Sequence, residues 1–285
     1  MTSSVSFAQA PDGVRIRIHH LGGSGPPLVC VHATGFHGRL WEPFIPKLRE
    51  HFTVIALDQR GHGESDKPET DYRWKFFGDD VLAVVDALEL DEAPAGIGHS
   101  AGGAALIFAE TTRPGTFSRL VLLDPTTMPQ EFRGLAAHLE NPMAESARRR
   151  RAVWDSPEQM IERFKRPTSP FATWQDDFLR AYAVYGTRQL DDGTFELLCP
   201  PHIEAQVYET AGSNDGWDRL AEIECRTLLL TGTDSPMWGG GRSDQACERL
   251  RNGECEQITG GHFFPMENPD ATVARALPFL QANDG

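Results

Sequence analysis

A serine between two glycines is the first candidate for chemistry in this sequence. Residues 97–103 read IGHSAGG, so Gly98 and Gly102 lie two positions before and after Ser100. The apolar residues before this stretch predict a buried strand, and the alanines and large apolar residues after it predict a helix. So tight a strand-to-helix turn strains the serine backbone and leaves no room for side chains at the two glycine positions. The pattern predicts a hydroxyl presented above a sheet edge, beside the backbone N–H of Ala101 at the helix start.

A base and an acid for this serine occur near the end of the chain. A serine hydroxyl is a poor nucleophile near neutral pH, so it needs a histidine base and an acid that orients the base. Asp234 follows one apolar strand and His262 follows the next, each after glycine. We therefore predict a triad of Ser100, Asp234 and His262 at one edge of a sheet. Asp124, which closes another apolar segment, is the alternative acid, and geometry has to decide between the two carboxylates.

Strands and helices alternate along much of the chain, and they must position these residues. Several strands are continuously apolar, as expected when both faces of a sheet are covered. Such alternation is typical of an α/β fold, here a mostly parallel sheet of eight strands flanked by helices. We expect strands at 5–9, 14–20, 26–32, 52–58, 94–97, 119–124, 226–232 and 254–259, and helices at 40–50, 76–90, 101–112, 243–252 and 269–281.

The alternation breaks between residues 126 and 220. Helical stretches punctuated by prolines dominate this segment. We predict a helical cap at 126–220, inserted into a core domain formed by 1–125 and 221–285. Such a cap would lie over the carboxyl ends of the strands, where open α/β sheets bind ligands.

Composition excludes some classes of partner. The formal net charge of −14 argues against nucleic acid, because phosphate binding requires a basic surface. No apolar run approaches the roughly 20 residues of a membrane span. The first residues lack the charged and apolar regions of a secretory signal. We expect a small-molecule substrate and no membrane partner, while the oligomeric state is not readable.

The cysteines and histidines indicate neither a disulfide framework nor a metal site. The five cysteines are odd in number and scattered, without a C-x-x-C pair, so we expect reduced thiols and a cytoplasmic location. No metal-ligand spacing such as HExxH is present, so no metal and no cofactor are expected.

Four motifs in this order resemble the α/β-hydrolase superfamily. They are GHSAG, LDQRGHGES (57–65), LTGTD (230–234) and GGHFFPMENP (260–269). The resemblance covers nearly the whole chain outside the insertion. It implies an oxyanion hole formed by the backbone N–H groups of Ala101 and of Thr34, in the loop HATGF. Ala33 stands where the family usually has glycine, which is the one departure in that loop.

The residues that contact the substrate are less constrained by the sequence. Phe36 and Met237 follow residues of the catalytic loops, and they either line the pocket or pack in the core. The aromatic side chains of the insertion favour a substrate with an apolar acyl or ring portion. Between 133 and 190 the chain has ten Lys and Arg against seven Asp and Glu. This excess either steers anionic substrates or belongs to solvated helix faces.

These observations predict a cofactor-free serine hydrolase that cleaves a carboxylic ester or lactone through an acyl-enzyme. Relatives resembling this sequence also cleave carbon–carbon bonds in dienoates, or act as perhydrolases or thioesterases, and the fold cannot choose among them. Epoxide hydrolases and haloalkane dehalogenases are disfavoured, because their elbow residue is an aspartate. A ligand-binding receptor on the same fold is a remote alternative.

Overall fold

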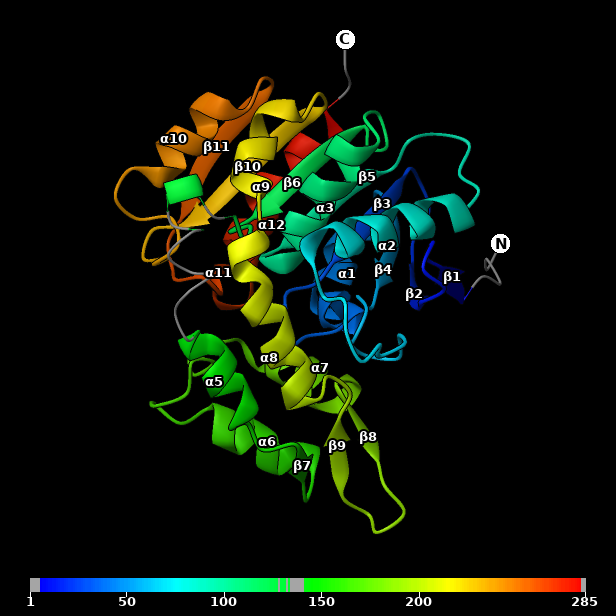
Figure 1. Cartoon of the computed structure of the whole chain (residues 1–285), viewed down its shortest axis with the longest axis vertical. Coiled ribbons are helices and arrows are strands. Elements are labelled where there is room, and N and C mark those ends of the chain that lie inside the picture. Colours follow the sequence, from blue (N-terminus) through cyan, green and yellow to red (C-terminus); the bar gives the residue numbers. More distant parts are fainter. Residues whose placement is uncertain (1–5, 128, 132, 134–140, 283–285) are drawn as a thin grey trace.

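A large twisted sheet forms the centre of the protein. The computed structural model describes residues 6–127, 129–131, 133 and 141–282. Within them, eight strands pair in the order β1-β2-β4-β3-β5-β6-β10-β11 (Figure 1), as predicted. Two neighbouring pairs, β1–β2 and β2–β4, are antiparallel, and all the other pairs in this sheet are parallel. The strands are β1 (Phe7–Gln9), β2 (Arg15–Gly22), β3 (Pro27–Val31), β4 (Thr53–Leu57), β5 (Ala95–His99), β6 (Arg119–Leu123), β10 (Arg226–Gly232) and β11 (Gly253–Ile258).

Helices cover both faces of this sheet, and successive residues of its central strands point to opposite faces. In β3, Leu28 and Cys30 pack with η1, α1, α11 and α12, whereas Val29 and Val31 pack with α2, α3, α9 and α10. The predicted helix at 40–50 is two short ones, because prolines within it cannot donate backbone hydrogen bonds. The helices are η1 (Gly38–Phe44), α1 (Ile45–Leu48), α2 (Trp74–Ala87), α3 (Ala101–Thr112), α9 (Gly216–Arg219), α10 (Arg242–Arg249), α11 (Phe264–Glu267) and α12 (Pro269–Gln281).

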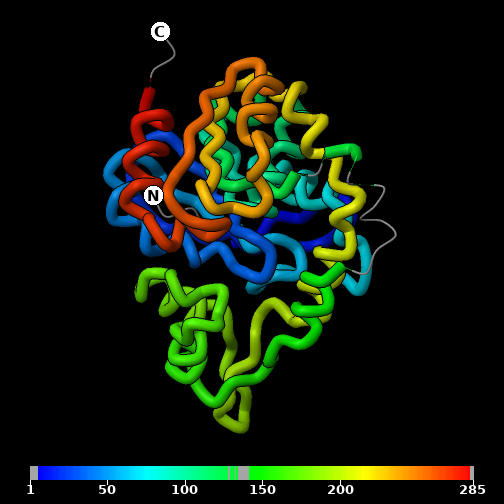
Figure 2. The backbone as a smooth tube through the Cα atoms, turned by 90° about the vertical axis from the view of Figure 1, so that its left-hand side faces the viewer, coloured from blue at the N-terminus to red at the C-terminus, as the bar shows by residue number. Residues whose placement is uncertain are grey.

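The segment between β6 and β10 forms most of a second lobe beneath the sheet (Figures 1 and 2). It is not purely helical, because it also contains a small antiparallel sheet in the order β7-β9-β8. The exact division into core and cap domains stays a prediction. The elements of this segment are α5 (Pro142–Arg148), β7 (Val153–Trp154), α6 (Pro157–Phe164), α7 (Asp176–Tyr185), β8 (Thr187–Gln189), β9 (Phe195–Leu197), α8 (Pro201–Glu209), η2 (Thr210–Ser213), α9 and η3 (Leu220–Glu222).

The described part of the chain contains no helix long and apolar enough to cross a membrane.

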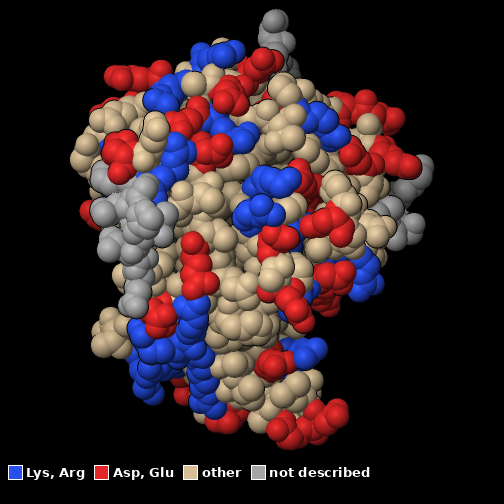
Figure 3. All heavy atoms as spheres, in the orientation of Figure 1, with Lys and Arg blue, Asp and Glu red and all other residues tan. Residues whose placement is uncertain are grey.

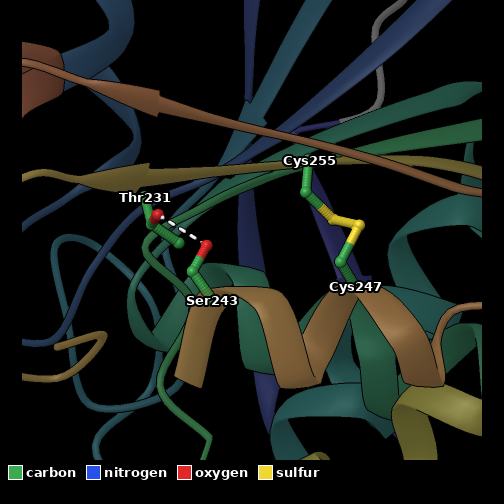
Figure 4. The surroundings of a disulfide bond; sticks show 4 residues. All are labelled: Thr231, Ser243, Cys247 and Cys255. Atoms are coloured by element: carbon green, nitrogen blue, oxygen red, sulfur yellow. Dashed lines mark hydrogen bonds between the residues drawn. A yellow bond between two sulfur atoms is a disulfide. The ribbon is translucent and has the colours of Figure 1, made fainter. Parts of the chain in front are cut away.

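Two of the five cysteines form a disulfide, contrary to the expectation of five reduced thiols. Cys247 on α10 and Cys255 on β11 are bonded, with their Cα atoms 5.9 Å apart (Figure 4). The same helix is tied to the neighbouring strand β10 by a hydrogen bond of 3.1 Å between the hydroxyls of Ser243 and Thr231. The antiparallel return of the chain from α10 to β11 brings the two cysteines together, and their spacing alone does not indicate this. The cytoplasmic location, which rested partly on reduced thiols, stays a prediction.

Removing the disulfide is expected to lower the free energy of unfolding by about 2–3 kcal/mol, because the bond closes a short loop in the unfolded chain. The two cysteines are separated by eight positions in the sequence. Urea unfolding of the double variant Cys247→Ser/Cys255→Ser checks this, with Cys225→Ser as the control for loss of an unpaired thiol. Equal unfolding midpoints for the double variant and the oxidised wild type would contradict the pairing.

Candidate active site

Ser100 occupies the strained turn that the glycine pattern predicts. Its backbone has φ 53° and ψ −116°, in a region that side-chain-bearing residues rarely adopt. The Ser100 N–H donates to the Leu123 carbonyl at 2.9 Å, which holds the turn against β6. A Cβ atom at Gly98 would lie 2.6 Å from the Gly102 backbone, and one at Gly102 would lie 2.1 Å from the Val31 carbonyl oxygen. Both glycines are therefore required by close backbone approach.

His262 lies within hydrogen-bond distance of the serine. Its Nε2 is 2.9 Å from Ser100 Oγ, and its Nδ1 is 2.6 Å from Oδ2 of Asp124. An ionised carboxylate only accepts hydrogen bonds, so Nδ1 carries the proton and Nε2 accepts from the serine hydroxyl. The serine and histidine predicted from the sequence therefore meet in the orientation that proton abstraction needs.

The acid beside His262 is Asp124, and the prediction of Asp234 for this position is wrong. The Asp124 side chain is fully buried, and its Oδ1 accepts from the Gly232 N–H at 2.9 Å. Its Oδ2 accepts from the Ser235 hydroxyl at 2.7 Å, in addition to the bond from His262. Asp234 is exposed, and none of the hydrogen bonds found in the described part of the chain involves its carboxylate. The structure therefore holds one carboxylate rigidly under the imidazole and directs the other to solvent.

The path of the loop after β11 explains this choice. A Cβ atom at Gly232 would lie 2.3 Å from the carbonyl oxygen of Gly261, so this loop crosses directly over the end of β10. The crossing carries His262 to the end of β6, which is the neighbour of the strand before Ser100. The sequence signal for Asp124 was its position immediately after a buried apolar strand. Ser235 carried no comparable signal.

The loop predicted to supply Thr34 to an oxyanion hole is anchored by hydrogen bonds at Ala33, Gly35 and Phe36. The Gly35 N–H donates to Nε2 of His62 at 2.9 Å, and the Gly35 carbonyl accepts from the Tyr182 hydroxyl at 3.4 Å. The Ala33 carbonyl accepts from the Phe36 N–H at 3.2 Å. Among the hydrogen bonds of the described residues, none uses the N–H of Thr34. The donor that the resemblance implies is therefore not used by another group of the described residues.

The departure at Ala33 has a simple structural account. The left-handed residue of this loop is Gly35, with φ 81°, and Ala33 does not have a positive φ. Ala33 is instead buried in the core. Ala101 begins α3, and its N–H likewise has no acceptor among the described residues, as expected in the first turn of a helix. The use of Thr34 and Ala101 as an oxyanion hole stays a prediction.

Buried histidines surround the site and are held in the neutral form. Burial lowers the pKa of His99 to about 3 and that of His62 to about 4. The ring of His99 donates from Nε2 to the His262 carbonyl at 2.8 Å, which supports the loop that carries the base. His62 donates from Nδ1 to the Arg60 carbonyl at 2.9 Å, so its Nε2 is free to accept from Gly35. These neutral rings fix the two loops on either side of Ser100.

An aromatic cluster lies beside His262. The Phe36 ring centroid is 5.3 Å from Trp174 and 5.6 Å from Tyr182, both from the segment between β6 and β10. Phe171 and Phe263 also belong to the cluster, with ring centroids 4.7 and 5.5 Å from that of Trp174. Phe263 directly follows His262, so an apolar surface adjoins the base. Ser100 itself is only 7% exposed.

Met237 does not belong to this aromatic cluster. It packs against the hydrophobic core on the other face of the sheet, with Trp238 and Leu250. Of the two interpretations that the sequence left open, core packing therefore describes Met237, whereas Phe36 lies among the rings near the site.

The motif LDQRGHGES has a supporting role in the structure. Buried Asp58 accepts from the Gly38 N–H at 2.6 Å, and its Oδ2 lies 3.0 Å from Nε2 of His19. Arg60 is fully buried and pairs with Asp80 at 2.6 Å and with Asp12 at 2.8 Å. Among the interactions of the described residues, none joins Asp58 or Arg60 to Ser100, His262 or Asp124.

Basic side chains gather on one face of the lobe formed by the β6–β10 segment (Figure 3). Arg148 pairs with Glu145 at 2.8 Å and also with Glu209, and Arg151 pairs with Asp155 at 3.3 Å. This pairing favours the interpretation of solvated helix faces over steering of anionic substrates. In the described residues, no group of three or more His, Cys, Asp or Glu is arranged to hold a metal ion.

One known protein family matches most of this chain. Residues 28–276 match the family described as the alpha/beta hydrolase family. The chain belongs to this family. A soluble epoxide hydrolase from a Corynebacterium species is 38% identical over 279 residues, which cover 93% of each chain. Several other curated relatives match over only about a third of their own length.

Solved structures show the same fold. The crystal structure of E-2-(acetamidomethylene)succinate hydrolase has a TM-score of 0.81 at 21% identity, with 97% of this chain and 98% of that chain covered. An esterase from a Rhodococcus species has a TM-score of 0.75 at 23% identity, with 98% and 99% covered. At these identities the likeness concerns the fold, on which hydrolases of several bond types occur.

Proposed function

We propose that the protein is a serine hydrolase that cleaves a carboxylic ester or lactone through an acyl-enzyme. The observation that carries this proposal is the continuous line of hydrogen bonds from Ser100 through His262 to buried Asp124. This arrangement supplies a nucleophile, a base and a group that orients the base, which are the three parts that acyl transfer needs.

The reaction follows from the proton positions. As Ser100 Oγ attacks the substrate carbonyl carbon, its proton moves to Nε2 of His262, and Asp124 stabilises the imidazolium. The N–H groups of Thr34 and Ala101 bind the oxyanion of the tetrahedral intermediate. The imidazolium then protonates the leaving alcohol as the carbon–oxygen bond breaks. Water activated by His262 attacks the acyl-enzyme, and Ser100 recovers its proton when the acid departs.

Epoxide opening is a poor fit to this nucleophile, although one relative is an epoxide hydrolase. An aspartate elbow would form an ester with the epoxide carbon, which water can hydrolyse. Ser100 would form an ether, which an activated water does not cleave, so the enzyme would stop after one turnover. We therefore propose acyl chemistry and expect no turnover of epoxides.

The aromatic cluster around Phe36 supports an apolar acyl or ring portion in the substrate. Arg150, a cation near the Gly35 loop, is already engaged by Glu204 and Tyr182, so it offers little free charge for a carboxylate. This argues for a neutral ester over a dicarboxylate such as the succinate named for the structural neighbour.

Labelling with a fluorophosphonate probe tests the nucleophile. Wild type is expected to form a stoichiometric adduct at Ser100, because the probe reacts only with an activated hydroxyl, and Ser100→Ala is expected to form none. Intact-mass spectrometry measures the adduct. Ser118→Ala, in a position before β6, is the control for loss of a serine elsewhere. Labelling that persists in Ser100→Ala would end the assignment.

A substrate panel tests the bond type. Neutral aryl esters, lactones, an acidic amide, a dienoate and an epoxide are compared by kcat/KM. We expect turnover of the esters or lactones above that of the others. Activity on the dienoate or on the amide alone would replace the ester proposal, and stoichiometric binding without turnover would favour a receptor.

A further inference from the structure

The turn after β6 delivers a second functional group besides the Asp124 carboxylate. Asp124 has φ 44°, a strained value for a residue with a side chain. Pro125 then packs directly on the first turn of α3, where a Cβ atom at Gly103 would lie 2.8 Å from Cβ of Pro125. The last glycine of IGHSAGG is thus required by this contact. The turn places the next residue, Thr126, beside Ser100.

Thr126 is held by its backbone on two sides. Its N–H donates to the carbonyl of Ser100 at 3.0 Å, and its own carbonyl accepts from Nδ2 of Asn214 at 2.8 Å. Asn214 is fully buried, and its Oδ1 accepts from the Gly216 N–H at 2.9 Å. With the backbone fixed in this way, the Thr126 hydroxyl lies 3.0 Å from Oγ of Ser100.

The direction of this hydroxyl–hydroxyl bond follows from the rest of the site. Nε2 of His262 is an acceptor, because Nδ1 carries the proton that is donated to Asp124. When the single proton of Ser100 Oγ points to Nε2, Oγ can only accept from Thr126. The Thr126 hydroxyl is then a donor aimed at a lone pair of the nucleophile.

We propose that Thr126 is a further catalytic residue, whose hydroxyl donates to Ser100 Oγ and holds it in line with His262. This inference rests on the proposed function, in which Ser100 is the nucleophile. In acylation, Oγ gives its proton to His262 Nε2 and forms the bond to the carbonyl carbon. In deacylation, that bond breaks and Oγ takes the proton back. Thr126 donates to Oγ in the resting enzyme and while the proton of Oγ moves to His262, and Thr126 keeps its own proton throughout.

Inactivation kinetics with a fluorophosphonate test this role, because the first covalent step is measured without later hydrolysis. Thr126→Val keeps the shape of the side chain and removes the hydroxyl. Its maximal inactivation rate is expected to fall about tenfold, while the probe concentration at half-maximal rate is unchanged, since only an interaction with the reacting oxygen is lost. Thr126→Ser is expected to restore the rate to within about threefold of wild type, in line with the retained donor.

Thr127→Val is the matched control, because no hydrogen bond found in the described part of the chain joins the Thr127 hydroxyl to Ser100. It is expected to react at the wild-type rate. If Thr126→Val unfolds, Thr126→Ala gives the same comparison without added bulk. A wild-type rate in the folded hydroxyl-free variant overturns the inference. Failure of wild type itself to react with the probe overturns the proposed function instead, so the two failures are distinct.

Discussion

Replacing Asp124 with asparagine is expected to lower kcat by about 10,000-fold, the scale found when a triad acid becomes an amide. The Gly232 N–H donates to Oδ1 of this side chain, so the amide oxygen of asparagine would take that position. The amide NH2 would then face His262 and donate to Nδ1. The imidazole would have to carry its proton on Nε2, where it no longer accepts from Ser100. The geometry stays intact while the base has the wrong tautomer.

Asp234→Asn is the matched control for this variant. Its carboxylate is exposed and outside the hydrogen bonds of the triad, so kcat is expected to stay within about twofold of wild type. Steady-state kinetics on the best ester of the panel measure both variants, and urea unfolding shows whether Asp124→Asn is folded. A large loss of kcat in Asp234→Asn with little loss in Asp124→Asn would reverse the assignment of the acid.

The free energy of unfolding is expected to fall as the pH drops below 6.5, because buried histidines are held neutral in the folded protein. This loss begins at a higher pH than the titration of carboxylates. Burial lowers the pKa of His37 and of His62 to about 4, and that of His99 to about 3, from an ordinary 6.5. Burial also holds the pKa of His32 well below its ordinary value. Between pH 6.5 and 4 the unfolded chain binds protons at these rings and the folded chain does not. Their stabilising contribution is therefore complete above pH 6.5 and is lost as the pH falls through this window.

The size of this effect makes it measurable. Each such histidine changes the free energy of unfolding by about 1.4 kcal/mol per pH unit, so several together give about 4–5 kcal/mol per unit between pH 6 and 5. Urea unfolding at pH 7.5, 6 and 5 gives the slope. His62→Gln keeps an acceptor for Gly35 without a titrating ring. It is expected to reduce the slope of the free energy of unfolding by about 1.4 kcal/mol per pH unit, the contribution of one histidine. A free energy of unfolding that is constant from pH 7.5 to 5 would contradict the neutral, buried state of these rings.

Most of the fold follows from local patterns in the sequence. Apolar runs such as 26–32 and 119–124 mark strands because burial on both faces leaves no polar alternation. The glycines around Ser100 mark the elbow because backbone atoms approach them within van der Waals distance, and this contact is local in the chain. His262 follows for a similar reason, since glycines precede it after the last strand.

The carboxylate that pairs with His262 was not predictable from local patterns. The choice between the two candidate aspartates depends on which strand ends are neighbours in space. Asp124 and Asp234 both follow apolar strands, and only the crossing of the 260–262 loop over Gly232 separates their roles. Two further features depend on which segments the fold brings together in space. They are the disulfide between Cys247 and Cys255 and the small sheet of the inserted segment. Thr126 carried no signal, because its hydroxyl matters only once the turn after Asp124 brings it to Ser100.

The position of Asp124 directly after β6 gives two neighbouring residues of the loop after β10 different structural requirements. Among the hydrogen bonds of the described residues, none uses the Asp234 carboxylate, so the structure does not require an acid at this position. Ser235 remains constrained, because its hydroxyl holds Asp124. The beginning of one loop thus holds an exposed carboxylate and a buried hydroxyl side by side, and only the hydroxyl supports Asp124.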